Sequence, residues 1–185
     1  THHLTKTQTD GLRVLAAKHG TTLFPVLTAG FAAVLHRITG REKFLLGTIT
    51  ENRSFTSLDQ VVGCFVNIVP LLCETAPEHS GSVLIDALSQ HIGQALAHAQ
   101  LPFDDIVRLS DGHRHKDRAP LFDLAITFND LDHIDRKTFS GIPITDVTPD
   151  SRDAKYDLLL AISPAPNASS VRSSWSVSNR TGTSN

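Results

Sequence analysis

Apolar residues recur along this chain with two different periods, and the period predicts which segments are helical. A spacing of three to four residues predicts helices over 9–19, 23–38 and 82–99, and a shorter one from Pro102 to Leu109. Gly20 and Gly40 follow the first two helices and are well placed to end them. The second helix is apolar on nearly every side, so we expect it to be buried.

Continuous or alternating apolar runs predict the strands. These runs are 44–50, 65–73, 121–128, 142–147, 156–162 and 171–177. Pro70 has no backbone N–H to donate, so the second run is expected at a sheet edge or a bulge. Helices and strands mix without regular alternation, which favours an α/β or α+β class with a mixed sheet covered by helices.

Composition describes a globular domain and excludes several classes of function. The 185 residues, 40% hydrophobic and 19% charged, can bury one sizeable core. A net charge of -2, without a basic run interleaved with aromatics, gives no electrostatic reason to bind nucleic acid or an anionic membrane. No apolar stretch reaches the ~18 residues of a membrane helix. The start lacks the build of a signal peptide, so we expect a cytoplasmic protein.

The residue types used by common catalytic sites are not arranged in known patterns. Cys64 and Cys73 lie among apolar residues, which predicts two buried thiols and no disulfide. The ten histidines show no zinc spacing, so we expect no metal site. The sequence has neither a phosphate-binding glycine loop nor a Gly-x-Ser-x-Gly elbow. No complete nucleophile and base is therefore recognisable from the sequence.

Five short motifs follow one another in an informative order. They are Gly20–Phe24 with Leu35–Arg37, Gly47-Thr48 with Asn52-Arg53, Val62–Asn67, His98–Asp104 and Arg118–Asp123. In this order and at these distances they resemble the C-terminal half of a condensation domain from a nonribosomal peptide synthetase. The resemblance runs from about residue 12 to about residue 175.

The resemblance implies the fold of chloramphenicol acetyltransferase, in which two similar lobes meet in a V around a tunnel. It implies that residues 1–177 correspond to the C-terminal lobe. The segment 178–185 is polar and lacks apolar anchors, so we expect a frayed tail or an artificial end. Within the family, carrier proteins present substrates on phosphopantetheine arms, and an amide forms between an acyl or peptidyl donor and an aminoacyl acceptor. The expected partners are the N-terminal lobe, peptidyl carrier proteins and an adjacent adenylation domain of a multimodular synthetase that makes an antibiotic-like peptide.

The catalytic HHxxxDG motif of the family belongs to the N-terminal lobe and is not found in these 185 residues. His2 and His3 do not begin such a motif, because Thr7 and Gln8 stand where Asp and Gly are needed. We expect this pair to be a frayed linker, unable to hold the geometry that a catalytic base requires. The chain alone is thus expected to be an inactive fragment of an acyltransferase-like enzyme, with no cofactor bound directly.

The resemblance also assigns candidate site residues. Arg53 matches a family arginine that pairs with the Asp of HHxxxDG across the lobes, a task that suits a guanidinium. The alternative is a solvated loop arginine, and in this lobe alone we expect it to have nothing to bind. Asn67 is expected in mid-strand, where it either orients a crossing backbone segment or touches the substrate arm. Gly63 is expected to allow a close approach of backbone.

Two further candidates are less specific. His98 matches the histidine of the family's HQDxPFE motif, although Leu101-Pro102-Phe103 also fits a simple helix start with a hydrophobic plug. Asn129 matches an asparagine that ends a family strand near the tunnel. The resemblance implies that it hydrogen-bonds the acceptor substrate or the pantetheine arm, and a turn-forming asparagine is an equal alternative. The loop from Arg114 to Pro120 departs from the family pattern at several polar positions.

Two other functions stay open at this point. One is a degenerate condensation-like domain that recruits a partner protein instead of forming bonds, which the altered 114–120 loop favours. The other is a lobe of an epimerization or heterocyclization domain, since these share the fold. The donor, the acceptor and the stereochemical subtype are not specified by the sequence.

Overall fold

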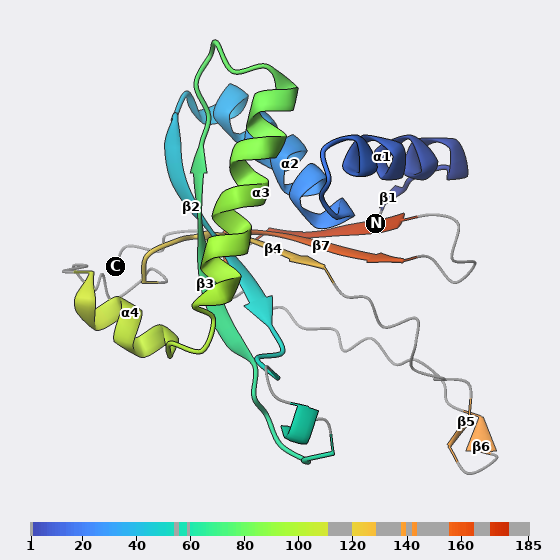
Figure 1. Cartoon of the computed structure of the whole chain (residues 1–185), viewed down its shortest axis with the longest axis vertical. Coiled ribbons are helices and arrows are strands. Elements are labelled where there is room, and N and C mark those ends of the chain that lie inside the picture. The colour runs from blue at the N-terminus through green and yellow to red at the C-terminus, as the bar shows by residue number, and fades with distance from the viewer. Residues whose placement is uncertain are drawn as a thin grey trace, which may run out of the picture.

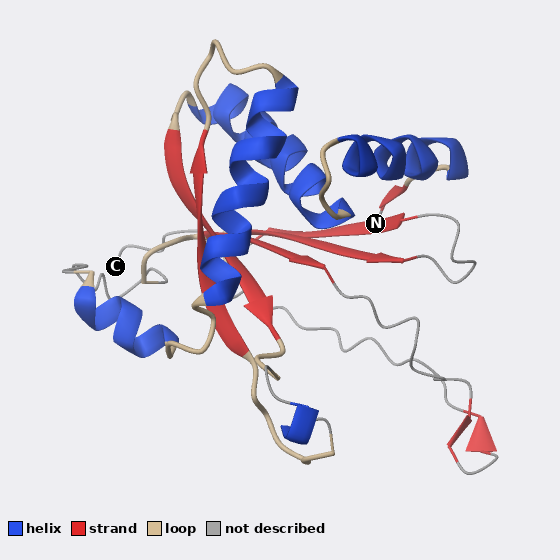
Figure 2. Ribbon diagram, in the orientation of Figure 1, coloured by secondary structure: helices blue, strands red, loops and turns tan. Residues whose placement is uncertain are grey.

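A six-stranded mixed sheet with helices against it forms the body of the protein (Figures 1 and 2). The computed structural model describes residues 2–53, 56–58, 60–110, 120–128, 138–139, 142–143, 156–164 and 171–177. Its helices are α1 (Lys6–Lys18), α2 (Leu23–Thr39), α3 (Gly81–Ala97) and α4 (Phe103–Leu109), with a 3-10 turn η1 (Thr56–Leu58). Its strands are β1 (His2–His3), β2 (Lys43–Thr50), β3 (Asn67–Glu74), β4 (Leu124–Phe128), β5 (Thr138–Phe139), β6 (Ile142–Pro143), β7 (Leu158–Pro164) and β8 (Val171–Val177).

The main sheet has the strand order β1-β8-β7-β4-β2-β3. The central pairs β2–β4 and β4–β7 are parallel, whereas the outer pairs are antiparallel, so the expected mixed sheet is confirmed. β3 is an edge strand, as Pro70 predicts, because an edge tolerates a residue that donates no ladder hydrogen bond. β5 and β6 pair with each other in a separate ribbon.

Alternation along the strands divides the buried side chains between the two faces of the sheet. Leu46, Leu71 and Ile126 point to one face and are fully buried beneath α1, α2 and α3. The large cluster on that face also takes Phe31, Leu35, Leu84 and Leu88 from the helices. This face supplies most of the hydrophobic stabilisation of the fold.

The opposite face carries a smaller aromatic cluster over the middle of the sheet. Phe122 lies between Phe103 of α4 and Tyr156, with ring centroids 5.6 and 6.0 Å away. The ring of Phe122 covers Gly47 of β2 so closely that an added Cβ would lie 2.0 Å from it. The Gly47-Thr48, Leu101–Phe103 and Leu121–Phe122 motif segments therefore meet in one packing unit.

Several predicted boundaries are confirmed and others are wrong. α2 ends at Gly40 in a left-handed conformation (φ 68°), as expected. α1 begins at Lys6 rather than near Asp10, because Thr5 and Gln8 form a capping box that starts the helix earlier. α2 is not buried all round, since Val34 and Ile38 are exposed by 52% and 76%.

The N-terminal and motif segments also differ from expectation. His2 and His3 are not frayed; they pair as β1 with Ser173 and Arg172 of β8. β3 begins at Asn67, so this asparagine lies at the start of the strand and not within it. The preceding Phe65 and Val66 belong to the loop, because the ladder with β2 ends at the Thr50–Asn67 pair. The predicted tail 178–185 and most of the predicted strand 142–147 lie outside the described residues.

The two cysteines are free, as predicted, but only one of them is buried. Cys73 points into the main core, and burial raises the pKa of its thiol to about 12. Cys64 is exposed, because its part of the loop before β3 is not covered. The prediction of two buried thiols is therefore wrong for Cys64.

This difference predicts a selective reaction with thiol reagents. At about pH 8 we expect only Cys64 to react rapidly in the native chain, because the thiolate is the nucleophile and Cys73 holds its proton. Absorbance with Ellman's reagent should report one thiol in native buffer and two in denaturant. The Cys64→Ser variant should show none until it is unfolded, and a rapid native reaction of this variant would contradict the structure.

Among the described residues, no single helix is long and apolar enough to cross a bilayer. Only α1 and α2 taken together reach the required length and composition, and they are bent by 104° at their junction.

Candidate functional site

The candidate site is built around the segment between β2 and β3, residues 51–66, which we call the motif loop. The loop extends beyond the end of the β2–β3 pair and contains η1 (Figure 2). Arg53, near its start, is half-buried and organises the rest of the loop. Its Nη1 donates to the carbonyl oxygens of Leu58 and Val61, the latter at 3.1 Å, and its Nη2 donates to Gly63 at 3.3 Å.

The expectation that Arg53 would have nothing to bind in this chain is therefore wrong. A guanidinium has five N–H donors, and the three carbonyls use three of them. Among the described residues, no acceptor takes the Nε–H or the second Nη2–H, and two such donors are the number that a bidentate carboxylate takes. Within the described part of the loop, Arg53 is thus an anchored cation with two donors left.

An aromatic ring adds to this anchoring. The Arg53 guanidinium lies over the ring of Phe65, 4.6 Å from its centroid, which is a cation–π distance. Gly63 lies beside the same ring, and a Cβ there would be 3.2 Å from Phe65 Cε2. Gly63 therefore admits an aromatic ring, and not the backbone segment that the sequence led us to expect.

Asn52 is a functional candidate that sequence reasoning missed. It has a left-handed backbone (φ 51°), and its side-chain oxygen is buried without a hydrogen-bond partner among the described residues. A buried acceptor is normally paired, so this oxygen marks a place where a donor is needed. The signal available in the sequence was its position directly before Arg53.

Asn67 clamps the connection between α3 and α4. Its Nδ2 donates to the carbonyl oxygens of Ala99 and Leu101, both at 2.8 Å. The backbone N–H of Phe103 donates to its Oδ1 at 3.2 Å. Both ends of the amide are thus used on backbone groups, which is the orienting role considered for this residue; contact with a substrate arm stays a prediction.

Of the other predicted site residues, only His98 is described, and it does not join this loop. His98 is the exposed C-cap of α3, and no hydrogen bond links its side chain to a described residue. Asn129 and the 114–119 part of the altered loop lie outside the described residues. Among the described residues, no group of three His, Cys, Asp or Glu side chains could hold a metal ion.

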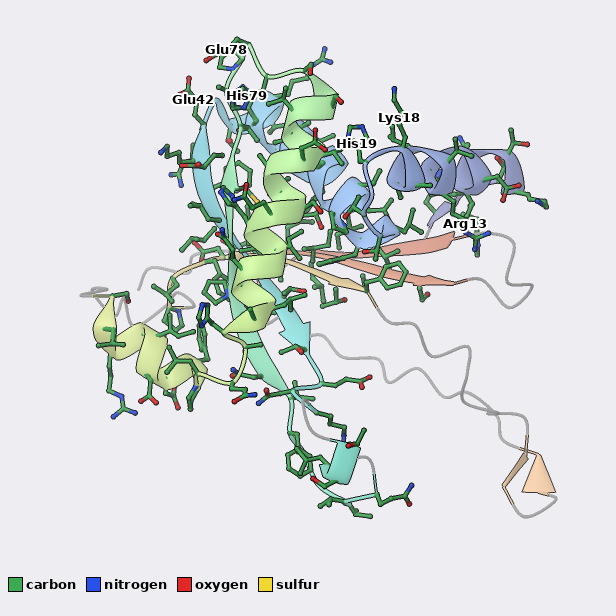
Figure 3. All side chains as sticks on the ribbon, in the orientation of Figure 1. Arg13, Lys18, His19, Glu42, Glu78 and His79 are labelled. Carbon is green, nitrogen blue, oxygen red and sulfur yellow. The ribbon has the colours of Figure 1, made fainter. Side chains whose placement is uncertain are left out.

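A hydrogen-bonded line of Asp86, His19 and Ser82 lies at the helices, away from the motif loop (Figure 3 labels His19). His19 Nδ1 is 2.6 Å from Asp86 Oδ1, and its Nε2 is 3.3 Å from Ser82 Oγ. Asp86 is 60% exposed, so water screens its charge, whereas the His19 side chain is 7% exposed. We interpret the line as a tie between the end of α1 and the start of α3.

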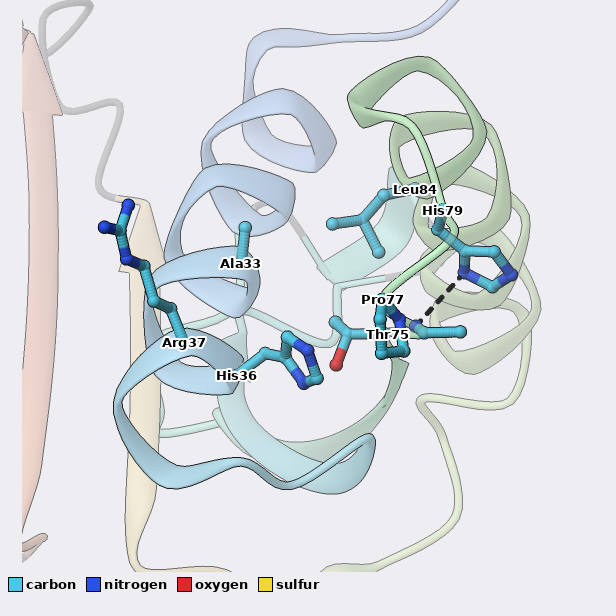
Figure 4. Close-up of a pocket in the computed structure, with 8 residues that line it drawn as sticks. Ala33, His36, Arg37, Thr75, Pro77, His79 and Leu84 are labelled. Carbon is cyan, nitrogen blue, oxygen red and sulfur yellow. Dashed lines mark hydrogen bonds between the residues drawn. The ribbon is translucent and has the colours of Figure 1, made fainter.

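Two concave regions lie elsewhere on the fold. One, of about 380 Å³, is bounded by the end of α2 and the segment before α3 (Figure 4). In it His36 and His79 flank Pro77, while the labelled Arg37 directs its guanidinium away. The other is an apolar groove of about 320 Å³ at α1, α2 and β7. Neither is lined by a motif-loop residue, so neither bears on the candidate site.

The chemistry available at the motif loop is electrostatic. Arg53 is permanently charged, is oriented by four contacts within its loop, and has two donors that no described residue uses. Val62 beside it is fully exposed, and Val61 and Val66 are exposed by 44% and 54%. A charged anchor rimmed by exposed apolar side chains suits contact with another protein surface.

Comparison with known proteins agrees with the motifs. The family model described as Condensation domain matches residues 1–176. Phosphinothricin tripeptide synthetase PhsC from Streptomyces viridochromogenes is 35% identical over 156 residues, which are 83% of this chain and 14% of that protein. Tyrocidine synthase 2 from Brevibacillus parabrevis is 29% identical over 154 residues, 83% of this chain and 4% of that protein. The chain thus spans a small part of these relatives.

Solved structures share the fold. The first condensation domain of the calcium-dependent antibiotic synthetase, in complex with a substrate analogue, has a TM-score of 0.70 and 22% identity, covering 95% of this chain and 38% of that one. The X-domain from teicoplanin biosynthesis has a TM-score of 0.81 and 17% identity, covering 94% and 40%. These likenesses agree with the expected chloramphenicol acetyltransferase-like fold. With a family match over nearly its whole length, the chain belongs to the condensation domain family of nonribosomal peptide synthetases.

Proposed function

We propose that this chain is the C-terminal lobe of a condensation domain and supplies one wall of the tunnel in which an amide bond forms. The motifs follow the order of the family's C-terminal half, and the chain covers 38% to 40% of the condensation-type structures named above. The HHxxxDG lobe would be supplied by the rest of the domain. The activity belongs to the assembled domain, because orienting two thioesters requires both walls.

In the proposed reaction, the amine of an aminoacyl thioester attacks the carbonyl carbon of an acyl or peptidyl thioester. The C–N bond forms, the C–S bond breaks, the thiol of the donor arm leaves, and a proton is lost from the nitrogen. The phosphopantetheine arms of two peptidyl carrier proteins tether the substrates. We also propose that an adenylation domain lies next to this domain in the synthetase, and that the protein is cytoplasmic.

The observation that carries the proposal is the state of Arg53. Its side chain is held by carbonyls of its own loop, and no other described residue takes its Nε–H or its second Nη2–H, which supports a carboxylate as their acceptor. The buried oxygen of Asn52 next to it also needs a donor. Docking of the HHxxxDG loop here would give the Arg53 donors a carboxylate acceptor, the Asp of that motif, and the Asn52 oxygen a donor. We therefore propose that Arg53 pairs with this Asp.

The test uses a complete condensation domain in which this chain follows an HHxxxDG-bearing lobe. Two loaded carrier proteins are mixed with it, and the condensed thioester is followed by mass spectrometry. We expect product from the wild type and a loss of about 100-fold for Arg53→Ala, because an unpaired carboxylate is left in the site. Arg37→Ala, a change of the same charge on the exposed part of α2, should leave the rate unchanged. Equal rates for Arg53→Ala and wild type would overturn the role of Arg53.

Recruitment of a partner protein is the second candidate, and one observation favours it. The X-domain of teicoplanin biosynthesis shares the fold, and a complex of that X-domain with OxyB also matches, with a TM-score of 0.77. In the same assay, stable association of the lobes without any product would favour recruitment. An epimerization or heterocyclization lobe would instead release an epimerized or cyclized thioester.

A further inference from the structure

We propose that Phe65 is a positioning residue for the Arg53 contact, acting as the platform that holds the guanidinium at the orientation in which its remaining donors face a carboxylate. This inference rests on the proposed function of Arg53 and deepens it. We assign Phe65 no contact with substrate or with reacting atoms, because Phe65 acts through Arg53.

The carbonyl contacts alone do not restrain the Arg53 guanidinium fully. All three accepting carbonyls belong to residues 58–63 of the same loop, and they hold the edge of the group that carries Nη1 and Nη2. Hydrogen bonds to one edge leave the opposite part of the group free to move. The Arg53 Cζ lies over the ring of Phe65, 4.6 Å from the ring centroid, so the ring is a separate contact that limits this movement.

The motif loop also leaves room for the Phe65 ring. At Gly63 a side chain would begin 3.2 Å from Phe65 Cε2, tighter than an ordinary van der Waals contact. The Gly63 carbonyl meanwhile accepts from Arg53 Nη2 at 3.3 Å. Gly63 therefore contributes to both restraints, which gives a physical reason for a glycine two residues before the aromatic ring.

An aromatic ring can hold the guanidinium in a way that an aliphatic side chain of the same size does not. The negative face of the ring attracts the cation, whereas a leucine of similar volume only fills space. A purely structural Phe65 would tolerate Leu, since conservative apolar exchanges are accepted in packed sites. A platform for Arg53 would reject Leu and accept Tyr, which keeps the ring face.

The experiment measures single-turnover condensation in the complete domain described above, with both carrier proteins loaded. Phe65→Leu should lower the rate about five- to tenfold, the worth of a partly desolvated cation–π contact. Phe65→Tyr should stay within about twofold of wild type. In an Arg53→Ala background, Phe65→Leu should have no further effect, because the platform has lost the group it positions. A wild-type rate for Phe65→Leu, or additive losses in the double variant, would overturn the inference.

A second measurement does not depend on catalysis. In this chain the ring current of Phe65 should shift the Arg53 Nε–H proton resonance upfield, and Phe65→Tyr should keep the shift while Phe65→Leu removes it. An unshifted wild-type resonance would also overturn the inference. The Arg53→Ala variant distinguishes a failure of this inference from a failure of the proposed function. If Arg53→Ala loses no product, the proposed function of Arg53 is contradicted. If Arg53→Ala loses product but Phe65→Leu does not, only the role of Phe65 is contradicted.

Discussion

Replacing Gly47 with alanine is expected to lower the free energy of unfolding by about 3 kcal/mol, because the new methyl group would overpack a closed aromatic cluster. The added Cβ would lie 2.0 Å from Phe122 Cε2, so the ring must move. It cannot move freely, since Phe103 and Tyr156 flank it. On the strand, Gly47 is paired with Pro70 on one side and Ala125 on the other, which prevents β2 from withdrawing.

The matched control is Gly93→Ala in α3, where an added Cβ has no neighbour within 4 Å. Alanine in a helix interior should raise the free energy of unfolding by about 0.5–1 kcal/mol. Urea unfolding followed by circular dichroism gives both values. Changes of the same sign and size in the two variants would show that Phe122 does not cover Gly47 as described.

Replacing Asn67 with leucine is expected to lower the free energy of unfolding by about 3 kcal/mol, since three backbone groups lose their partner. The carbonyls of Ala99 and Leu101 and the N–H of Phe103 are all held by this one amide. We therefore expect the loss to be local first, at the connection between α3 and α4. Hydrogen exchange of the Phe103 amide should accelerate in Asn67→Leu.

Asn67→Asp separates the two ends of the clamp. Aspartate keeps an oxygen for the Phe103 N–H but loses both donors, so the Phe103 amide should stay protected while stability falls. The Ile106 amide, which donates to Pro102 and not to Asn67, is the internal reference for exchange. Identical Phe103 exchange in the Leu and Asp variants would contradict the clamp.

A structural feature could be predicted from the sequence when it depends on residues that are close together along the chain. The end of α2 at Gly40 and the edge position of β3 at Pro70 were predictable, because each depends on the backbone of a single residue. The start of α1 was missed because the capping box at Thr5 and Gln8 precedes the apolar repeat. The exposure of Cys64 was missed because apolar neighbours in sequence do not guarantee cover in space.

At the candidate site, too, the sequence identified individual residues but not the contacts between them. The motifs identified Arg53, Gly63 and Asn67 in advance, and the order of the motifs identified the family. They did not reveal that Phe65 lies under Arg53, or that Asn67 holds a segment 32 to 36 residues further along the chain. Those contacts depend on how the loop returns to the end of β2, which no local pattern encodes.

By itself, the sequence determined the class of fold, most helices and strands, and membership of the condensation domain family, because periodicity and motif order are properties of the chain read in one dimension. Only the tertiary structure decided what the motif residues do to one another. It showed that Arg53, expected from the sequence as an interlobe partner or a solvated loop arginine, is anchored within its own loop. It also showed that Gly63 leaves space for a ring and that Asn67 is a clamp. The physical reason is that hydrogen bonds and ring contacts need groups within a few ångströms, and packing of the sheet and helices is what brings distant segments that close.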